Sequence, residues 1–155
     1  LQTNKIKYII QYIKLIHSVD SLHLLQAVDT EAAKKNVVVD CLLQFHIATE
    51  ETKFGMSIDE ARQLLASDGF KAMHNVRICG VMGIGSVTDS EQQTRAEFAS
   101  LKQIFDSLKS DFFADKPEFC QISMGMSDDY PIAIECGSTM VRVGSSIFGK
   151  RYYQV

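Results

Sequence analysis

Five short apolar runs, rich in β-branched residues, alternate along this chain with segments whose apolar residues recur at helical spacing. The runs occupy residues 15–19, 37–47, 77–82, 118–123 and 139–143. Such alternation is typical of parallel strands that are joined by crossover helices. The sequence therefore predicts an α/β fold built on a parallel sheet.

The segments between these runs have the features of crossover helices. Between the first two runs, apolar residues at three- and four-residue steps predict one buried helical face. Its members are Leu22, Leu25, Val28 and Ala32. Ser57 and Glu60 have the spacing of a capping box, so the next helix is expected to begin at Ser57. The longest helix is expected to begin at Ser90 and to carry an apolar stripe from Phe98 to Leu108.

Composition limits the class of protein. The 155 residues hold enough apolar material for one core and contain no linker or low-complexity tract, so a single domain over residues 1–155 is expected. A net charge of −3 argues against nucleic acid and membrane as partners, because both favour a broad basic surface. No apolar stretch approaches the ~18 residues of a membrane span and no secretory signal is evident, which predicts a cytoplasmic protein.

Neither a metal site nor a redox motif is expected. The four cysteines are far apart and include no Cys-x-x-Cys pair, which favours reduced side chains with packing roles. The histidines lack the spacing of metal ligands and are expected to be surface residues or hydrogen-bonded ones. They are His17, His23, His46 and His74. Asp128 and Asp129 are neighbouring carboxylates, but at the start of a predicted helix they more simply complement its dipole.

Polar residues and glycines gather where the last two predicted strands end. Residues 123–129 end one strand, and residues 142–146 end the next. Ligands of parallel α/β proteins bind at this edge of the sheet, because the βα loops and helix N-termini meet there. A candidate binding site is therefore expected at the carboxyl ends of these two strands.

Ser127, Gly144 and Ser145 have the chemistry of an anion site. Ser127 is predicted to cap a short helix over residues 128–135, so its hydroxyl and the amides that follow would face an anion. Gly144 allows a ligand to approach the backbone closely, and Ser145 and Ser146 add hydroxyl groups. Eight-stranded barrels commonly hold a phosphate between the loops after their last two strands. Each feature alone also fits an ordinary helix cap or turn.

Arg142 is a charged residue inside the last predicted strand. Side chains alternate along a strand, so Arg142 lies on the face opposite Val141 and Val143. If those valines pack against helices, Arg142 points into the interior of a barrel. A guanidinium in that position stays charged and needs a permanent acceptor, which is either a ligand or an internal ion pair.

The residues of this edge also match a known family. The C-terminal signature of the pyridoxal phosphate homeostasis family is similar to five segments of this chain. They are residues 123–129, 133–135, 137–139, 141–145 and 147–151. Upstream, residues 1–5 are similar to the family's Leu-Gln-x-Asn-Lys motif, residues 50–55 to its acidic Lys-Gly loop, and residues 80–84 with 95–98 to its sixth βα unit. The resemblance covers essentially the whole chain.

The resemblance implies a fold-type-III (β/α)₈ barrel similar to the N-terminal domain of alanine racemase. This chain would correspond to strands 4 to 8 with their helices, which makes it a partial TIM-type barrel. By resemblance, Ser127, Gly144 and Ser145 contact the phosphate of pyridoxal 5'-phosphate, and Arg142 approaches the pyridine nitrogen. An arginine beside that nitrogen keeps it unprotonated, because two adjacent positive charges repel.

The lysine that forms the Schiff base in this family lies upstream of the Leu-Gln-x-Asn-Lys motif, and the chain starts at that motif. We therefore expect a fragment that lacks the cofactor lysine, with a site that phosphate or sulfate is able to occupy. His46 stands where the family more often has asparagine. Five strands of a barrel leave two unpaired edges, which predicts self-association or pairing with the missing N-terminal portion.

The resemblance implies a non-catalytic function, namely binding and buffering of pyridoxal phosphate in the cell. A ring with an unprotonated nitrogen is a weaker electron sink, which is consistent with a carrier. The alternative is a fold-type-III enzyme such as an amino-acid racemase, which needs an acid or base on each face of the cofactor. The tyrosines offer no convincing second-face group; they are Tyr8, Tyr12, Tyr130, Tyr152 and Tyr153. A doubly wound phosphate-binding module is a further alternative, and strand order distinguishes it from a barrel.

Overall fold

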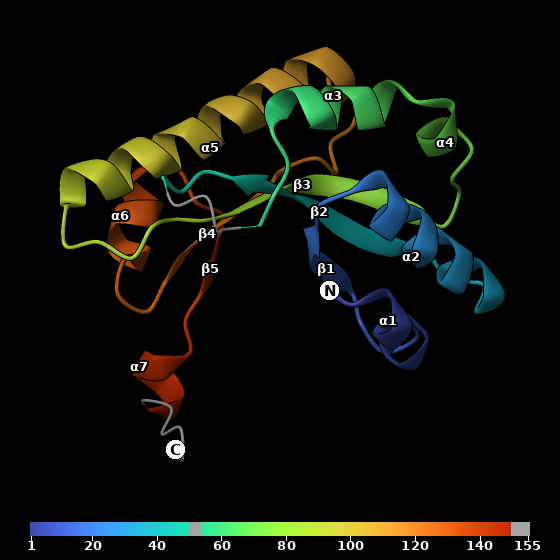
Figure 1. Cartoon of the computed structure of the whole chain (residues 1–155), viewed down its shortest axis with the longest axis horizontal. Helices are drawn as coiled ribbons and strands as arrows, with labels where there is room; N and C mark the ends of the chain where they lie inside the picture. Colours follow the sequence, from blue (N-terminus) through green and yellow to red (C-terminus); the bar gives the residue numbers. More distant parts are fainter. Residues whose placement is uncertain (50–53, 150–155) are drawn as a thin grey trace.

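The computed structural model describes residues 1–49 and 54–149 (Figure 1). Within them, five strands form one parallel sheet in the order β1-β2-β3-β4-β5. The bounds are β1 (Leu15–Val19), β2 (Val39–His46), β3 (Val76–Ile84), β4 (Gln121–Met126) and β5 (Met140–Arg142). Each strand pairs with the next one along the chain, as in the wall of a (β/α)₈ barrel. The predicted partial barrel is confirmed, and the doubly wound alternative is wrong.

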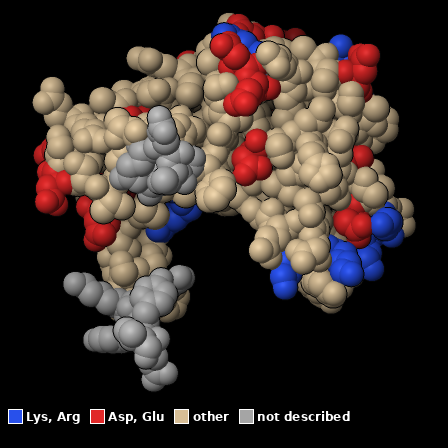
Figure 2. Space-filling view, in the orientation of Figure 1, with Lys and Arg blue, Asp and Glu red and all other residues tan. Residues whose placement is uncertain are grey.

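Most of the helices cover the outer face of the sheet. The helices are α1 (Thr3–Ile9), α2 (Leu22–Lys34), α3 (Ile58–Ala66), α4 (Asp68–Lys71), α5 (Glu91–Phe112), α6 (Tyr130–Glu135) and α7 (Ser145–Phe148). In Figure 1, α3, α4 and α5 lie on one side of the sheet, whereas α1 and α7 extend toward the other side at its two ends. Figure 2 shows the molecule hollowed on that other side, between the parts that carry α7 and α1. The sheet is thus a curled half-barrel with a concave inner face.

The main hydrophobic core lies between the sheet and the outer helices. Alternate residues of β2 belong to it, namely Cys41, Leu43 and Phe45. The predicted apolar stripe of α5 supplies Phe98, Leu101 and Leu108, which are fully buried. Burial of a leucine or phenylalanine side chain contributes roughly 1.5–3 kcal/mol. These contacts hold the sheet and its helices together.

A smaller apolar cluster marks the inner face of the sheet. Leu42, Cys79 and Met82 are buried there, with Leu15 and Ile84 packed against them. Because Leu42 stands between two residues of the main core in β2, its side chain projects from the opposite face. The inner face of the sheet therefore has a hydrophobic cluster separate from the main core.

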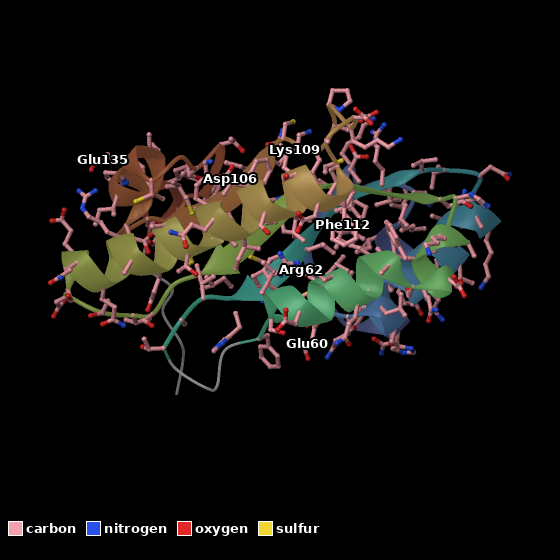
Figure 3. All side chains as sticks on the ribbon, turned by 90° about the horizontal axis from the view of Figure 1, so that it is seen from above. Glu60, Arg62, Asp106, Lys109, Phe112 and Glu135 are labelled. Carbon is pink, nitrogen blue, oxygen red and sulfur yellow. The ribbon has the colours of Figure 1, made fainter. Side chains whose placement is uncertain are left out.

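Arg62 connects two helices of the outer layer. Its Nη2 donates to Ser107 Oγ at 2.8 Å and to Asp111 Oδ2 at 3.0 Å. Figure 3 shows this side chain directed from α3 toward α5. Because the ion pair is partly exposed, it contributes no more than about 1 kcal/mol.

The strand boundaries depart from the predicted ones mainly at β4. The apolar run was expected to be a strand from residue 118, but β4 begins at Gln121 and continues to Met126. Phe119 precedes the strand in a turn and is buried for a different reason, because its ring stacks on Phe105 and Phe113 at centroid distances of 4.9 and 4.2 Å. The sequence reasoning also did not predict the short helices α1 and α4.

The two predicted helix starts at serines are found, although they differ in detail. Ser57 and Glu60 form the expected capping box at α3. Ser90 Oγ accepts from the Gln93 amide at the start of α5, but the Gln93 side chain bonds elsewhere. No helix among the described residues is long and apolar enough to cross a membrane. Most of the predicted Lys-Gly loop (50–55) and the tyrosines Tyr152 and Tyr153 lie outside the described residues.

Candidate functional site

The candidate site lies where β4 and β5 end, and Gly125 helps to build this edge. Gly125 has a φ of +94°, and a Cβ there would lie 2.5 Å from the Ala133 Cβ. A glycine is therefore needed for α6 to pack directly against β4. This close packing keeps the turn after β4 next to the start of α7, where the predicted anion residues lie.

Ser127 holds two backbone amides at this edge. Its Oγ accepts from the Gly144 amide at 3.1 Å and from the Ser146 amide at 3.3 Å. The prediction that Ser127 caps α6 is wrong, because the N-cap is Asp129 and the helix begins at Tyr130. Residues 127–129 form a turn in which Asp129 Oδ1 accepts from the Met126 amide. Because of this turn, the helix begins later in the chain than predicted. Ser127 consequently faces the β5–α7 segment instead of its own helix.

Gly144 and Ser145 complete the group that the sequence singled out. Both are exposed, and Ser145 is the first residue of α7. A Cβ built on Gly144 meets no heavy atom of the described residues within 4 Å. The space beside this glycine is therefore open, and the structure does bring Ser127, Gly144 and Ser145 together.

Arg142 points into the concave face, as the alternation along β5 predicts. Its Nη1 donates to Ser123 Oγ at 2.8 Å and its Nη2 donates to the Gly83 carbonyl at 3.0 Å. Neither bond uses Nε. Burial lowers the pKa of Arg142 and the carboxylate of Asp129 opposes this shift, yet an arginine remains charged at neutral pH. Its partners are therefore a hydroxyl and a carbonyl, and the predicted alternative of an internal ion pair finds no contact within 4.0 Å in the described part of the chain.

His17 reaches the same place from β1. Its Nδ1 lies 3.1 Å from Ser123 Oγ. Burial and then the charge of Arg142 lower the pKa of His17. Sequence reasoning gave neither His17 nor Ser123 a role in the site. Alternation along β1 could have indicated the face, since His17 stands two residues after Leu15 of the inner cluster.

A buried carboxylate connects the loops that follow β2 and β3, at the same edge of the sheet as the candidate site. Glu97 of α5 is only 5% exposed, and it accepts from the Ser86 amide and hydroxyl at 2.7 Å each and from Gln93 Nε2 at 3.1 Å. Thr49, after β2, donates its amide to Ser86 Oγ at 3.1 Å. Burial acts to raise the pKa of Glu97, but these hydrogen bonds together hold it below its usual value. The cluster fixes the loops after β2 and β3.

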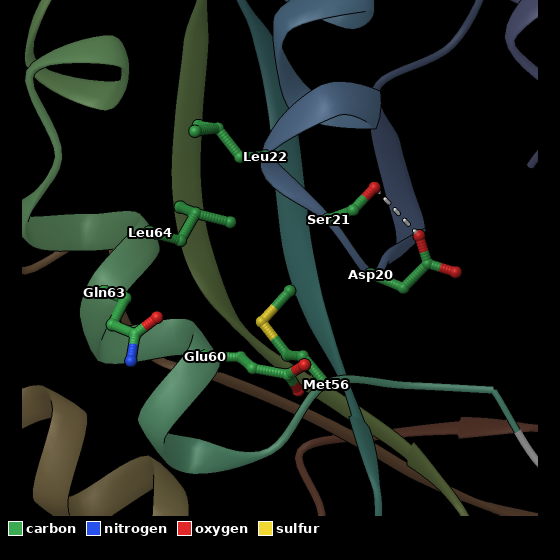
Figure 4. Close-up of a pocket in the computed structure, with 7 residues that line it drawn as sticks. All are labelled: Asp20, Ser21, Leu22, Met56, Glu60, Gln63 and Leu64. Atoms are coloured by element: carbon green, nitrogen blue, oxygen red, sulfur yellow. Dashed lines mark hydrogen bonds between the residues drawn. The ribbon is translucent and has the colours of Figure 1, made fainter.

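Two surface pockets lie beyond the carboxyl ends of the strands. One of about 310 Å³ is next to the candidate site, between the loops after β3 and β4; Ser86, Asp89, Met126 and Asp129 are among its lining residues. Another, also about 310 Å³, lies between the start of α2 and α3 (Figure 4). In the described residues, no group of three or more His, Cys, Asp or Glu side chains is placed to hold a metal ion.

Comparison with known proteins gives consistent matches over almost the whole chain. A family model described as "Alanine racemase, N-terminal domain" matches residues 1–152. The pyridoxal phosphate homeostasis protein of Aquifex aeolicus is 35% identical over 153 residues, which cover 99% of this chain and 65% of the relative. The protein of the same name from Helicobacter pylori is 34% identical over 149 residues, covering 96% of this chain and 63% of the relative.

A solved structure is also similar. PipY of Synechococcus elongatus PCC7942, with PLP bound, has a TM-score of 0.82 and 29% identity; the match covers 96% of this chain and 67% of that chain. The chain thus spans slightly less than two thirds of the length of the two curated relatives above.

Proposed function

The chain belongs to the alanine racemase N-terminal domain family, and on that premise we propose that it binds pyridoxal 5'-phosphate at the ends of β4 and β5. Its predicted resemblance to pyridoxal phosphate homeostasis proteins is confirmed. In the proposed site, Ser127, Gly144 and Ser145 contact the phosphate and Arg142 meets the pyridine nitrogen. The proposed role is a non-catalytic carrier that buffers this cofactor in the cytoplasm. The names of the relatives support a role in homeostasis of the cofactor, and the PLP-bound PipY structure supports its binding.

One observation carries the proposal: two backbone amides converge on a single oxygen, Ser127 Oγ, beside open space at Gly144. Amide groups that converge in this way suit a phosphate oxygen, which accepts more strongly than a hydroxyl because it is charged. Rotation of the Ser127 side chain would free the Gly144 and Ser146 amides for such an oxygen. The Ser127 hydroxyl could then donate to the same phosphate.

Arg142 supports the non-catalytic part of the proposal. When bound, the cofactor supplies an electron-accepting ring, and its strength as an acceptor depends on protonation of the ring nitrogen. A guanidinium stays charged and would oppose a second positive charge on that nitrogen. Within the described residues, the two hydrogen bonds of Arg142 use its Nη atoms, which leaves the Nε–H as a donor for an unprotonated nitrogen. Arg142 would therefore bind and orient the ring without activating it strongly.

Titration of the chain with inorganic phosphate and with pyridoxal 5'-phosphate tests the site. A hydrogen bond to a charged group is worth about 1.5–3 kcal/mol, so Ser127→Ala should weaken both affinities by roughly ten- to a hundredfold. Arg142→Met should weaken binding of the cofactor but not of phosphate. Ser100→Ala, on the exposed face of α5, is the matched control. Unchanged affinities in Ser127→Ala and Arg142→Met would remove the assignment.

The proposal includes non-covalent binding and no racemase activity. By resemblance, none of the lysines in residues 1–155 corresponds to the lysine that holds the cofactor in this family. The described tyrosines lie on the surface, with exposed fractions of 64% for Tyr8, 78% for Tyr12 and 37% for Tyr130. Borohydride should therefore trap no cofactor on a polypeptide of residues 1–155, and alanine should not racemise in its presence. A trapped lysine or measurable racemisation would overturn this part.

The proposal also covers the partners of the chain. In the described sheet β1 and β5 are the edge strands, and edge strands with unpaired backbone groups tend to recruit another chain. We expect either a second copy or a separate portion with further barrel strands to cover them. Sedimentation that shows a stable, folded monomer of 17.4 kDa would contradict this expectation.

A further inference from the structure

Three side chains from three strands meet on the concave face. Ser123 Oγ of β4 lies 2.8 Å from Arg142 Nη1 of β5 and 3.1 Å from His17 Nδ1 of β1. In the sheet, β1 and β4 are separated by β2 and β3, so the contact of His17 with Ser123 spans the curvature of the half-barrel. Ser123 is completely buried. The hydroxyl therefore has no water to replace a missing partner.

The donor and acceptor roles of this contact are determined by chemistry. A guanidinium only donates, so Ser123 Oγ accepts from Arg142. If His17 Nδ1 also carried a proton, both neighbours would donate to Oγ, and within the described residues the hydroxyl proton would have no acceptor. A buried donor without an acceptor destabilises the folded state. Ser123 therefore donates to Nδ1, and His17 is neutral with its proton on Nε2.

The charges around His17 favour the same state. Arg142 is the charged group that acts on it, and it lowers the pKa of His17 in addition to the effect of burial. The other titratable groups on this face of the described sheet are His46 of β2, Cys79 of β3 and, nearer the start of the strands, the ion-paired Asp40 and Arg77. Burial raises the pKa of Cys79 to about 11, so its thiol is neutral. Protonation of His17 would place a second cation beside the guanidinium and turn Nδ1 into a donor.

We propose that His17 and Ser123 are positioning residues for Arg142: His17 takes the Ser123 proton, and the hydroxyl oxygen then holds the guanidinium in one orientation on the inner face. The Gly83 carbonyl holds the second amino group, so both Nη atoms are engaged and Nε is left for a ligand. This inference rests on the proposed function, because Arg142 is the residue proposed to meet the cofactor ring. Protonation of His17 would release Arg142 from this orientation.

The first test needs no ligand. Nitrogen NMR of the ¹⁵N-histidine-labelled chain, assigned with His17→Asn, should show the His17 ring protonated on Nε2 and unprotonated on Nδ1. Its measured pKa should lie below 6.5 and should rise in Arg142→Met. An Nδ1-protonated ring, or a pKa that Arg142→Met leaves unchanged, would overturn the inference. The proposed cofactor site would be unaffected by either result.

The second test measures affinity. His17→Leu removes the acceptor, and the loss of a hydrogen bond predicts about three- to tenfold weaker binding of pyridoxal 5'-phosphate with unchanged binding of inorganic phosphate. His17→Asn is the matched variant, because its Oδ1 is also attached to Cγ and can accept from Ser123. It should bind with the affinity of the unmodified chain. Equal affinity in His17→Leu, or equal losses in both variants, would refute positioning by His17.

A pH profile separates positioning from a purely structural role. As the pH falls below 6.5, binding by the unmodified chain should weaken more than binding by His17→Asn, whose amide does not titrate. The difference between the two profiles cancels the titration of the ligand itself. Identical profiles would contradict the inference. If the unmodified chain bound neither ligand, the proposed function would fail, while the NMR result would still decide whether His17 and Ser123 position Arg142.

Discussion

Glu97 and Ser86 are joined by two hydrogen bonds of 2.7 Å, one from the Ser86 amide to Oε2 and one from its hydroxyl to Oε1. In Glu97→Gln, the NH₂ of the side-chain amide would replace one of the two carboxylate oxygens. It would then face the Ser86 amide or hydroxyl, which is itself a donor. We expect the free energy of unfolding to fall by about 1–3 kcal/mol, the cost of an unsatisfied buried group. Urea denaturation followed by circular dichroism measures this loss.

Glu91→Gln is the control for Glu97→Gln. Glu91 lies on the same helix, but its carboxylate is exposed and pairs with Arg95 on the surface. Exposed ion pairs contribute little to stability because solvent screens them, so the control should lose much less stability. Equal losses in the two variants would show that the Glu97 cluster does not hold the loops after β2 and β3.

Much of the fold could be predicted because the signals that determine it are local. The alternation of apolar runs and helical segments gave all five strands of the described sheet, and the Ser57–Glu60 spacing gave the start of α3. The start of β4 was predicted too early because of Phe119. A buried aromatic residue just before a strand has the same apolar pattern as the strand itself. An apolar side chain predicts that a residue is buried, but it does not predict which residues it packs against.

The candidate site could be predicted only in part. Its place at the strand ends and the inward direction of Arg142 follow from the parallel sheet and from the two-residue period of strands. Ser127 was placed correctly at this edge, but its partners are amides 17 and 19 residues away. The contact of His17 with Ser123 spans 106 residues and depends on the curvature of the sheet. No local pattern contains that information.

Gly125 should tolerate no side chain. Its φ of +94° disfavours other residues, and an alanine Cβ would meet the Ala133 Cβ at 2.5 Å. Gly125→Ala should therefore lower the free energy of unfolding by about 2 kcal/mol or more, from backbone strain together with overpacking. Thermal unfolding would show this as a lower melting temperature.

Gly137 separates the two causes of that loss. Its φ of +93° is nearly the same, but a Cβ there would meet only Lys102 side-chain atoms, at 3.4 Å and beyond. Gly137→Ala should thus carry the backbone strain without the clash and be the milder variant. If Gly137→Ala were as destabilising as Gly125→Ala, close packing of α6 on β4 would not be what requires a glycine at position 125.

Thiol reactivity should differ sharply among the cysteines. Burial raises the pKa of Cys41 to about 12 and that of Cys79 to about 11, whereas Cys120 is exposed. Because the thiolate is the reacting form, a disulfide reagent at mildly alkaline pH should modify Cys120 first and the two buried thiols slowly. Cys120→Ser should remove the fast phase, and a fast phase that persists at full amplitude would contradict this order.

The stability of the chain should depend on the protonation of His17. In the folded protein the pKa of His17 lies below its usual value of 6.5, so between the two values the unfolded chain binds more protons than the folded one. The contribution of neutral His17 is therefore complete above pH 6.5 and is lost as the pH falls through the folded pKa. Denaturant titrations at a series of pH values measure this dependence. His17→Asn should flatten it in that window, because the amide keeps the acceptor and does not titrate. His23→Asn, at an exposed position of α2, is the matched control for the loss of a histidine. A slope that is the same in His17→Asn as in the unmodified chain would mean that another group is responsible for it.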